Sequence, residues 1–210
     1  MANINWQKEI QPLIKKYKGK KHPLEFASTY QLVVAVVLSA QDSDRHINKI
    51  APAFFSAFPD MKALSKAEPA VIHQLIGDVR NFGNKTKWLL AMAQSIKEDK
   101  NIPTTLDGLT ELSGIGRKSA NVILRETGKK AEGIIVDLHV VRVAPRIGIA
   151  TGTDPKKIEK QMMEVIDAKD WGEVGMAISF LGREICRPSN PKCSECVMQS
   201  VCQYYHTEIA

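Results

Sequence analysis

The chain has 210 residues, 44% of them hydrophobic, and a formal net charge of +6. This apolar content is sufficient for a core and excludes a disordered chain. No apolar run approaches the roughly 18 residues of a membrane span, and the first residues carry no signal stretch, so we expect a cytoplasmic monomer without a membrane partner. The basic charge favours a polyanionic partner, although an ordinary solvated basic surface would give the same balance.

Apolar residues recur at helical spacing through the first half of the chain. Ser28 and Thr29 can cap a helix whose apolar run extends from Leu32 to Leu38. The β-branched residues of this run resemble a strand, but no partner strand with matching turns is nearby, so we predict a buried core helix. Pro69 stands where the first turn of a further helix tolerates proline. Similar spacing predicts helices over 6–17, 47–58 and 88–96.

The most informative stretch, residues 112–120, reads LSGIGRKSA and joins two predicted helices. The first helix carries leucines 106, 109 and 112 and ends at Ser113–Gly114; the second runs from about Arg117 to Glu126. Gly114 and Gly116 permit positive φ and a close backbone approach. The N–H groups that begin the second helix favour an anion, and a nucleic-acid phosphate is the natural ligand. An ordinary helical corner with a glycine cap is the alternative, and the adjacent Lys118 argues against it.

Downstream of this hairpin, Asp137 follows the apolar run 134–136 and precedes an apolar helix, so that by itself it reads as an N-cap. Asp154–Pro155 begins the next helix in the same manner. With no strand predicted anywhere, the fold class is all-α.

All four cysteines lie in one short C-terminal segment with the spacing Cys186-x6-Cys193-x2-Cys196-x5-Cys202. Thiols packed in this way are typical of metal ligands rather than of disulfides. Their chemistry fits either a [4Fe–4S] cluster or structural zinc. The cations that interleave with the ligands would lie against a nucleic-acid backbone: Arg183, Arg187 and Lys192.

These motifs together resemble the endonuclease III family of helix-hairpin-helix DNA glycosylases. The resemblance extends from about Leu32 to Cys202 and is carried by LSGIGRKSA, by residues 38–41 (LSAQ), by residues 136–139 (VDLH) and by the cysteine loop. Three positions depart from the family pattern: Ser113 replaces a proline, Leu138 a threonine, and Asn81 an apolar residue.

The resemblance implies a bifunctional glycosylase and AP lyase of base excision repair that excises oxidised pyrimidines from double-stranded DNA and cleaves 3′ of the abasic site. It assigns Lys118 as the nucleophile that forms a Schiff base and Asp137 as the carboxylate that stabilises charge and assists proton transfer. Gln41 and Asn81 would fill the space left by the flipped base. Gly114, Gly116 and Arg117 would contact DNA, and the four cysteines would hold a [4Fe–4S] cluster.

The family also implies two helical domains flanking a DNA-binding cleft. Residues 23–132 would form a helical domain with the hairpin at about 106–126, and residues 1–22 with 133–210 a discontinuous cluster domain. A mismatch-specific or other-lesion glycosylase of the same superfamily is the alternative within enzymes. A non-catalytic helix-hairpin-helix DNA-binding module is the alternative outside them.

Overall fold

The computed structural model describes residues 4–209, and within that range its regular elements are helices only. The prediction of an all-α fold is therefore confirmed. No helix among these residues has the length and apolar character needed to cross a membrane. The chain divides into two compact units: unit 1 contains the residues up to Lys20 and those from Lys130 onward, and unit 2 contains Lys21–Lys129.

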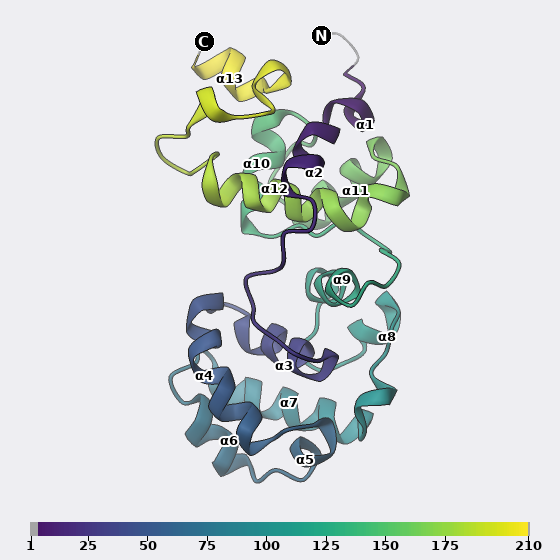
Figure 1. Ribbon diagram of the computed structural model, residues 1–210, viewed down its shortest axis with the longest axis vertical. Helices are drawn as coiled ribbons and strands as arrows, with labels where there is room; N and C mark the ends of the chain where they lie inside the picture. The colour runs from purple at the N-terminus through teal and green to yellow at the C-terminus, as the bar shows by residue number, and fades with distance from the viewer. Residues whose placement is uncertain (1–3, 210) are drawn as a thin grey trace. The chain divides into compact units, whose positions relative to one another are not determined.

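Unit 2 is built around α3, a helix with apolar residues on every side (Figure 1). The Ser28 hydroxyl caps its first turn by accepting from the Gln31 N–H at 3.2 Å, and residues 32–38 are all buried. The predicted core helix is thus confirmed, and α4, α7 and α9 pack around it. The helices of unit 2 are α3 (Thr29–Ser39), α4 (Asp44–Ala57), α5 (Met61–Ser65), α6 (Pro69–Ile76), α7 (Phe82–Ile96), α8 (Leu106–Thr110) and α9 (Arg117–Glu126).

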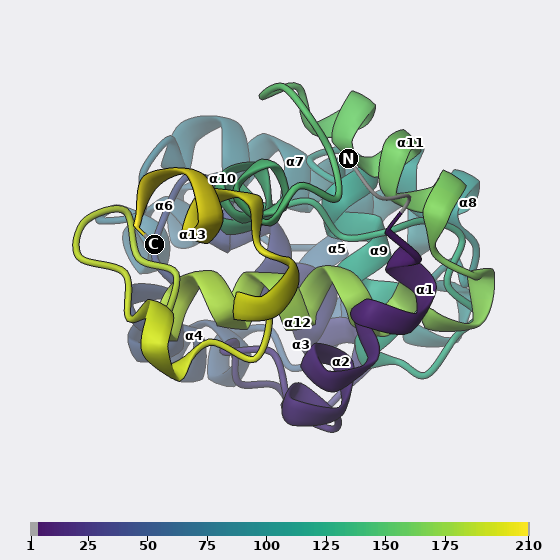
Figure 2. The ribbon, with the colours of Figure 1, turned by 90° about the horizontal axis from the view of Figure 1, so that it is seen from above.

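Unit 1 is organised by α12, which lies between α2 and α10 (Figure 2). Glycines allow its neighbours to approach closely: a Cβ on Gly175 would lie 2.3 Å from the Ile135 carbonyl oxygen, and one on Gly182 would lie 2.9 Å from the Cβ of His139. Because of these contacts, α12 runs directly beside the segment that begins α10. The helices of unit 1 are α1 (Trp6–Glu9), α2 (Gln11–Tyr17), α10 (Leu138–Ile147), α11 (Pro155–Val165), α12 (Trp171–Glu184) and α13 (Gln203–Glu208).

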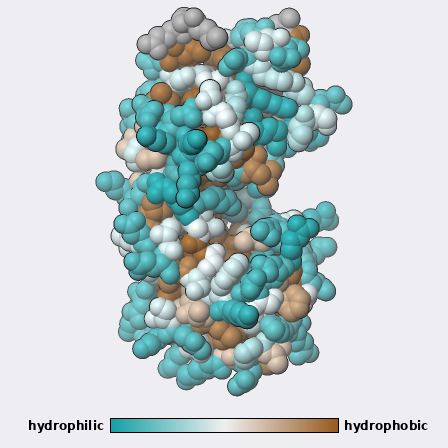
Figure 3. Space-filling model, turned by 180° about the vertical axis from the view of Figure 1, so that it is seen from behind, coloured by the Kyte–Doolittle hydropathy of each residue, from teal (hydrophilic) through white to brown (hydrophobic). Residues whose placement is uncertain are grey.

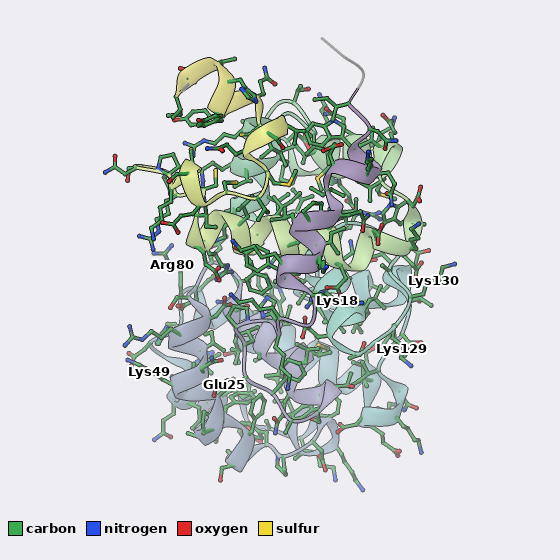
Figure 4. All side chains as sticks on the ribbon, turned by 45° about the horizontal axis from the view of Figure 1, so that its top comes forward. Lys18, Glu25, Lys49, Arg80, Lys129 and Lys130 are labelled. Atoms are coloured by element: carbon green, nitrogen blue, oxygen red, sulfur yellow. The ribbon has the colours of Figure 1, made fainter. Side chains whose placement is uncertain are left out.

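The surface is largely polar on the face shown in Figure 3, with apolar patches between the hydrophilic side chains. Several cations are exposed in unit 2, among them Lys49, Arg80 and Lys129, whose side chains extend away from the ribbon (Figure 4). Their exposure keeps positive charge available to a polyanionic partner.

Candidate functional site

The hairpin between α8 and α9 uses its two glycines differently. Gly114 has φ of +84°, and a Cβ there would lie 3.1 Å from the Trp88 ring and 3.2 Å from Val37. Both the conformation and the packing therefore require glycine. Gly116 has φ of −95°, so it does not use the positive φ that glycine permits, and a Cβ there would meet no protein atom within 4 Å.

The start of α9 is open to a ligand. Gly116 occupies the N-cap position and has no side chain with which to cap the first turn, while Ile115 is buried and anchors the hairpin. Arg117 and Lys118 are both exposed in this first turn. The positive end of the helix and two cations thus face the surface together, as an anion site requires. The preceding helix, α8, ends at Thr110 rather than at the predicted Ser113–Gly114.

Gln41 and Asn81 are both exposed and lie in turns that begin or end helices of unit 2. The Asn81 side-chain oxygen accepts from the Asn84 amide at 2.8 Å. Phe82 follows Asn81 and begins α7; 39% of this residue is exposed, and its ring meets His73 edge to face at 5.3 Å between centroids.

Asp137 lies in unit 1 as the N-cap of α10, as its sequence context predicts. One carboxylate oxygen, Oδ1, accepts from the backbone N–H groups of His139 and Val140 at 2.9 Å each. The other, Oδ2, accepts from the Ser179 hydroxyl at 2.6 Å and lies 3.9 Å from the Arg183 guanidinium. Only 12% of the Asp137 side chain is exposed. Donors from α10 and α12 therefore fix the orientation of both carboxylate oxygens.

Two of these partners were not anticipated from the sequence. Ser179 is fully buried in α12, within an apolar run where a lone serine gives no signal of its role. Arg183, one of the three cations expected to lie against a nucleic-acid backbone, lies 3.9 Å from Asp137 Oδ2, and its contact with DNA stays a prediction. Lys192 lies 3.5 Å from Glu195, and Arg187 is exposed.

The four cysteines are free thiols that line one cavity in unit 1. Apolar side chains complete its wall, among them Ile147, Leu181 and Ile185. Burial raises the pKa of the Cys196 and Cys202 thiols, and the neighbouring cysteines reinforce the effect.

Arg146 fixes the loop that carries the first of these cysteines. Its guanidinium lies 3.7 Å from the Cys186 sulfur, donates to the Arg187 carbonyl oxygen at 2.8 Å, and stacks over the Tyr204 ring at 4.7 Å. These contacts tie the Cys186 segment to α10, which carries Arg146.

The predicted site residues are divided between the two units. Unit 2 holds the hairpin, Lys118, Gln41 and Asn81, whereas unit 1 holds Asp137 and the cysteines. The pairing of Lys118 with Asp137 joins different units and stays a prediction.

The model of the HhH-GPD superfamily of base excision DNA repair proteins matches residues 34–168. Endonuclease III of Synechocystis sp. is 36% identical over 92% of this chain and 90% of its own length. Endonuclease III of Bacillus subtilis is 32% identical over 86% and 83%.

Solved structures agree with these sequence relatives. A trapped covalent intermediate of endonuclease III with DNA, an estranged-adenine complex, superposes with a TM-score of 0.86 at 25% identity and covers 99% of both chains. A non-covalent endonuclease III–DNA complex gives 0.83 at 26% identity, with 96% of both chains covered. A thermostable thymine-DNA glycosylase shares the fold, with a TM-score of 0.75 at 18% identity. The chain belongs to the HhH-GPD superfamily of base excision DNA repair proteins and, within it, to the endonuclease III family.

Proposed function

We propose that this chain is a DNA glycosylase and AP lyase that excises oxidised pyrimidines from double-stranded DNA. The observation that carries the proposal is the first turn of α9, where Lys118 is exposed beside an open helix N-terminus. The family relationship and the likeness to two endonuclease III–DNA complexes support DNA as the substrate.

Lys118 would supply the nucleophile. Its neutral amine attacks C1′ of the damaged nucleotide while the N-glycosidic bond breaks and the base leaves with the bonding electrons and gains a proton. Opening of the sugar ring gives a protonated Schiff base between Lys118 and C1′. Loss of a proton from C2′ then expels the 3′ phosphate, and water hydrolyses the Schiff base to regenerate the lysine.

Asp137 would act on the charge of this transition state. As the glycosidic bond breaks, positive charge develops on the sugar, and a fixed carboxylate lowers the energy of that state. Because the two oxygens are held by two backbone N–H groups and by Ser179, the carboxylate needs no reorganisation when the charge appears. Asp137 would also accept and return protons during elimination, the role that the family resemblance assigns to it.

The DNA backbone would be held by the hairpin, through the N–H groups after Gly116 and through Arg117. Such contacts position the duplex without reading its sequence. Gln41 and Asn81 would enter the base stack and fill the space of the flipped nucleotide, which offsets a few kcal/mol of unstacking.

The cysteine cavity would hold a [4Fe–4S] cluster with a structural role. Four thiolates in an apolar cavity repel one another unless a cationic centre neutralises them, so the donor set itself calls for metal. The spacing of the four cysteines resembles the cluster loop of the endonuclease III family, and in such a cluster each iron takes one thiolate. Anaerobically purified protein is therefore expected to be brown and to contain iron and sulfide; stoichiometric zinc without iron would contradict this assignment.

Borohydride trapping on DNA with an abasic site tests the proposed chemistry, because only an amine nucleophile gives a covalent adduct. We expect the natural chain to form the adduct, Lys118→Gln to lose it while it still binds duplex DNA, and Lys66→Gln, a matched change at another exposed lysine of unit 2, to retain it. A full adduct yield from Lys118→Gln would show that another amine attacks. Release of a damaged base without any trapped adduct would instead identify a glycosylase that uses water.

A further inference from the structure

Two exposed residues of unit 2 share an unusual backbone conformation. Gln41 and Asn81 have φ of 61° and 60°, in the left-handed region that side chains other than glycine rarely adopt. Asparagine tolerates this conformation, but glutamine is a poor choice for it. Strain of this kind persists only where the surrounding structure holds the residue in place. We call residues 40–43 the Gln41 turn and residues 79–81 the Asn81 turn.

One carboxylate joins these two turns directly. Asp42, which follows Gln41, accepts through Oδ2 from the backbone N–H of Arg80, which precedes Asn81, at 3.0 Å. Its Oδ1 accepts from the Ser43 N–H at 2.7 Å and lies 2.9 Å from His46 Nδ1. Only 12% of the Asp42 side chain is exposed. The carboxylate is thus committed to donors of the protein rather than presented to a phosphate, which it would repel.

A buried cation provides a second link between the same regions. The Lys85 ammonium donates to the Leu38 carbonyl oxygen at 2.6 Å, and the side chain is almost fully buried. Leu38 lies in the last turn of α3 and Lys85 in the first turn of α7, so this bond joins the two helix ends that carry the turns. Burial lowers the pKa of Lys85, while the charge of nearby Asp42 opposes that shift.

We propose that Asp42 is a positioning residue, which holds the Gln41 turn and the Asn81 turn at a fixed separation so that both side chains enter the DNA duplex as one preorganised unit. This inference rests on the proposed function, because it presumes that Gln41 and Asn81 fill the space of a flipped nucleotide. Insertion of two side chains loses less conformational entropy when their spacing is set before binding. Misplacement of either by about 1 Å is enough to slow catalysis strongly.

The first test compares Asp42→Ala with Asp78→Ala. Asp78 is an exposed carboxylate two residues before Arg80, so its removal changes the local charge equally without breaking the link. At saturating enzyme, we expect Asp42→Ala to lower the single-turnover rate of base excision about ten-fold. It should also lower the fluorescence of a 2-aminopurine placed opposite an uncleavable abasic-site analogue. Affinity for undamaged duplex should stay within about two-fold, because phosphate contacts supply it, and Asp78→Ala should match the natural chain.

The second test separates positioning from a general loss of structure. If Asp42 acts through the two inserted side chains, Asp42→Ala should change the rate less than about two-fold in a Gln41→Ala, Asn81→Ala background. The same loss in both backgrounds would overturn the proposal. Asp42→Asn keeps an acceptor oxygen and should fall between the natural chain and Asp42→Ala; it also replaces Asp42→Ala in both tests should that variant not fold. A rate equal to that of the natural chain in each folded Asp42 variant would equally overturn it.

The trapping assay keeps the two hypotheses apart. If the natural chain forms the Lys118 adduct but Asp42 variants insert normally, only the positioning role fails. If the natural chain forms no adduct and excises no base, the proposed function fails whatever the fluorescence shows.

Discussion

Asp137 and Lys118 are surrounded in opposite ways. The Asp137 carboxylate is largely buried and held by donors from two helices, whereas Lys118 is exposed in the first turn of a helix whose N-cap is a glycine. A group that stabilises charge works best when it is fixed before the reaction. A nucleophile must reach its target and afterwards move with the sugar to which it is bound. Under the proposed mechanism, unit 1 would supply a carboxylate that is fixed in advance, and unit 2 an amine that is free to move toward the sugar.

We expect the largest effect from a change at Asp137, the fixed group of this pair. Asp137→Asn should slow base excision by about 10²–10³-fold, because the charge that opposes the developing cation is lost. Asparagine is as good an N-cap as aspartate, but its amide nitrogen cannot accept the Ser179 hydrogen bond, so the midpoint of thermal unfolding should fall by a few degrees only. Single-turnover kinetics with a melting curve measures both, and a rate within a few-fold of the natural chain would remove Asp137 from the mechanism.

We expect a smaller effect when a residue that holds the Asp137 carboxylate in place is changed. Ser179→Ala removes the 2.6 Å hydrogen bond to Asp137 Oδ2, and a bond to a charged group contributes about 1.5–3 kcal/mol. If part of this free energy stabilises the fold and the rest stabilises the transition state, the excision rate should fall about ten-fold. Ser179→Thr keeps the hydroxyl and should recover most of the activity, if the buried site accepts the added methyl group.

A comparison of two substrates separates a role of Ser179 in positioning Asp137 from a role in stability. We expect Ser179→Ala to slow removal of a base more than it slows strand cleavage at a preformed abasic site, since the glycosidic bond is already broken there. Loss on both substrates only in proportion to the fraction of unfolded protein would point to a purely structural role for Ser179.

The two hairpin glycines should separate folding from binding. Gly114→Ala meets Trp88 and Val37 at positive φ and should destabilise the fold by about 1–3 kcal/mol. Gly116→Ala meets nothing within 4 Å, so stability should be unchanged while affinity falls for all duplexes alike. Denaturant unfolding and binding titrations measure these effects. Weakened binding confined to one lesion or one sequence context would contradict the phosphate role.

The smallest effect concerns the polar residue at position 81. A hydrogen-bonding side chain can distinguish the edges of the orphan bases, whereas an apolar one cannot. We therefore expect the natural chain to excise an oxidised pyrimidine at rates that differ several-fold among the four opposite bases, and Asn81→Leu to reduce that spread. Equal rates in the natural chain would exclude Asn81 from recognition.

Local signals predicted the elements that depend on neighbours in sequence. The caps at Ser28, Asp137 and Asp154 and the bounds of α9 all agree with the structure, because helix termini are set within a turn or two. The hydrogen bond from Ser179 to Asp137 spans 42 residues and depends on how α12 packs beside α10, which no local pattern encodes.

A second long-range contact escaped the sequence for a similar reason. The link between the Gln41 and Asn81 turns runs through a backbone N–H, and every residue but proline carries one, so the sequence marks only the Asp42 acceptor and not its partner.

The identity of the trapped amine is the most direct test of the account as a whole. Borohydride-reduced adduct with abasic-site DNA can be digested and mapped by mass spectrometry of the modified peptide. We expect the sugar remnant on the Lys118 side chain, in the peptide that begins α9. A remnant on any other lysine, or on the N-terminal amine, would contradict the assignment of the exposed first turn of α9 as the reacting centre.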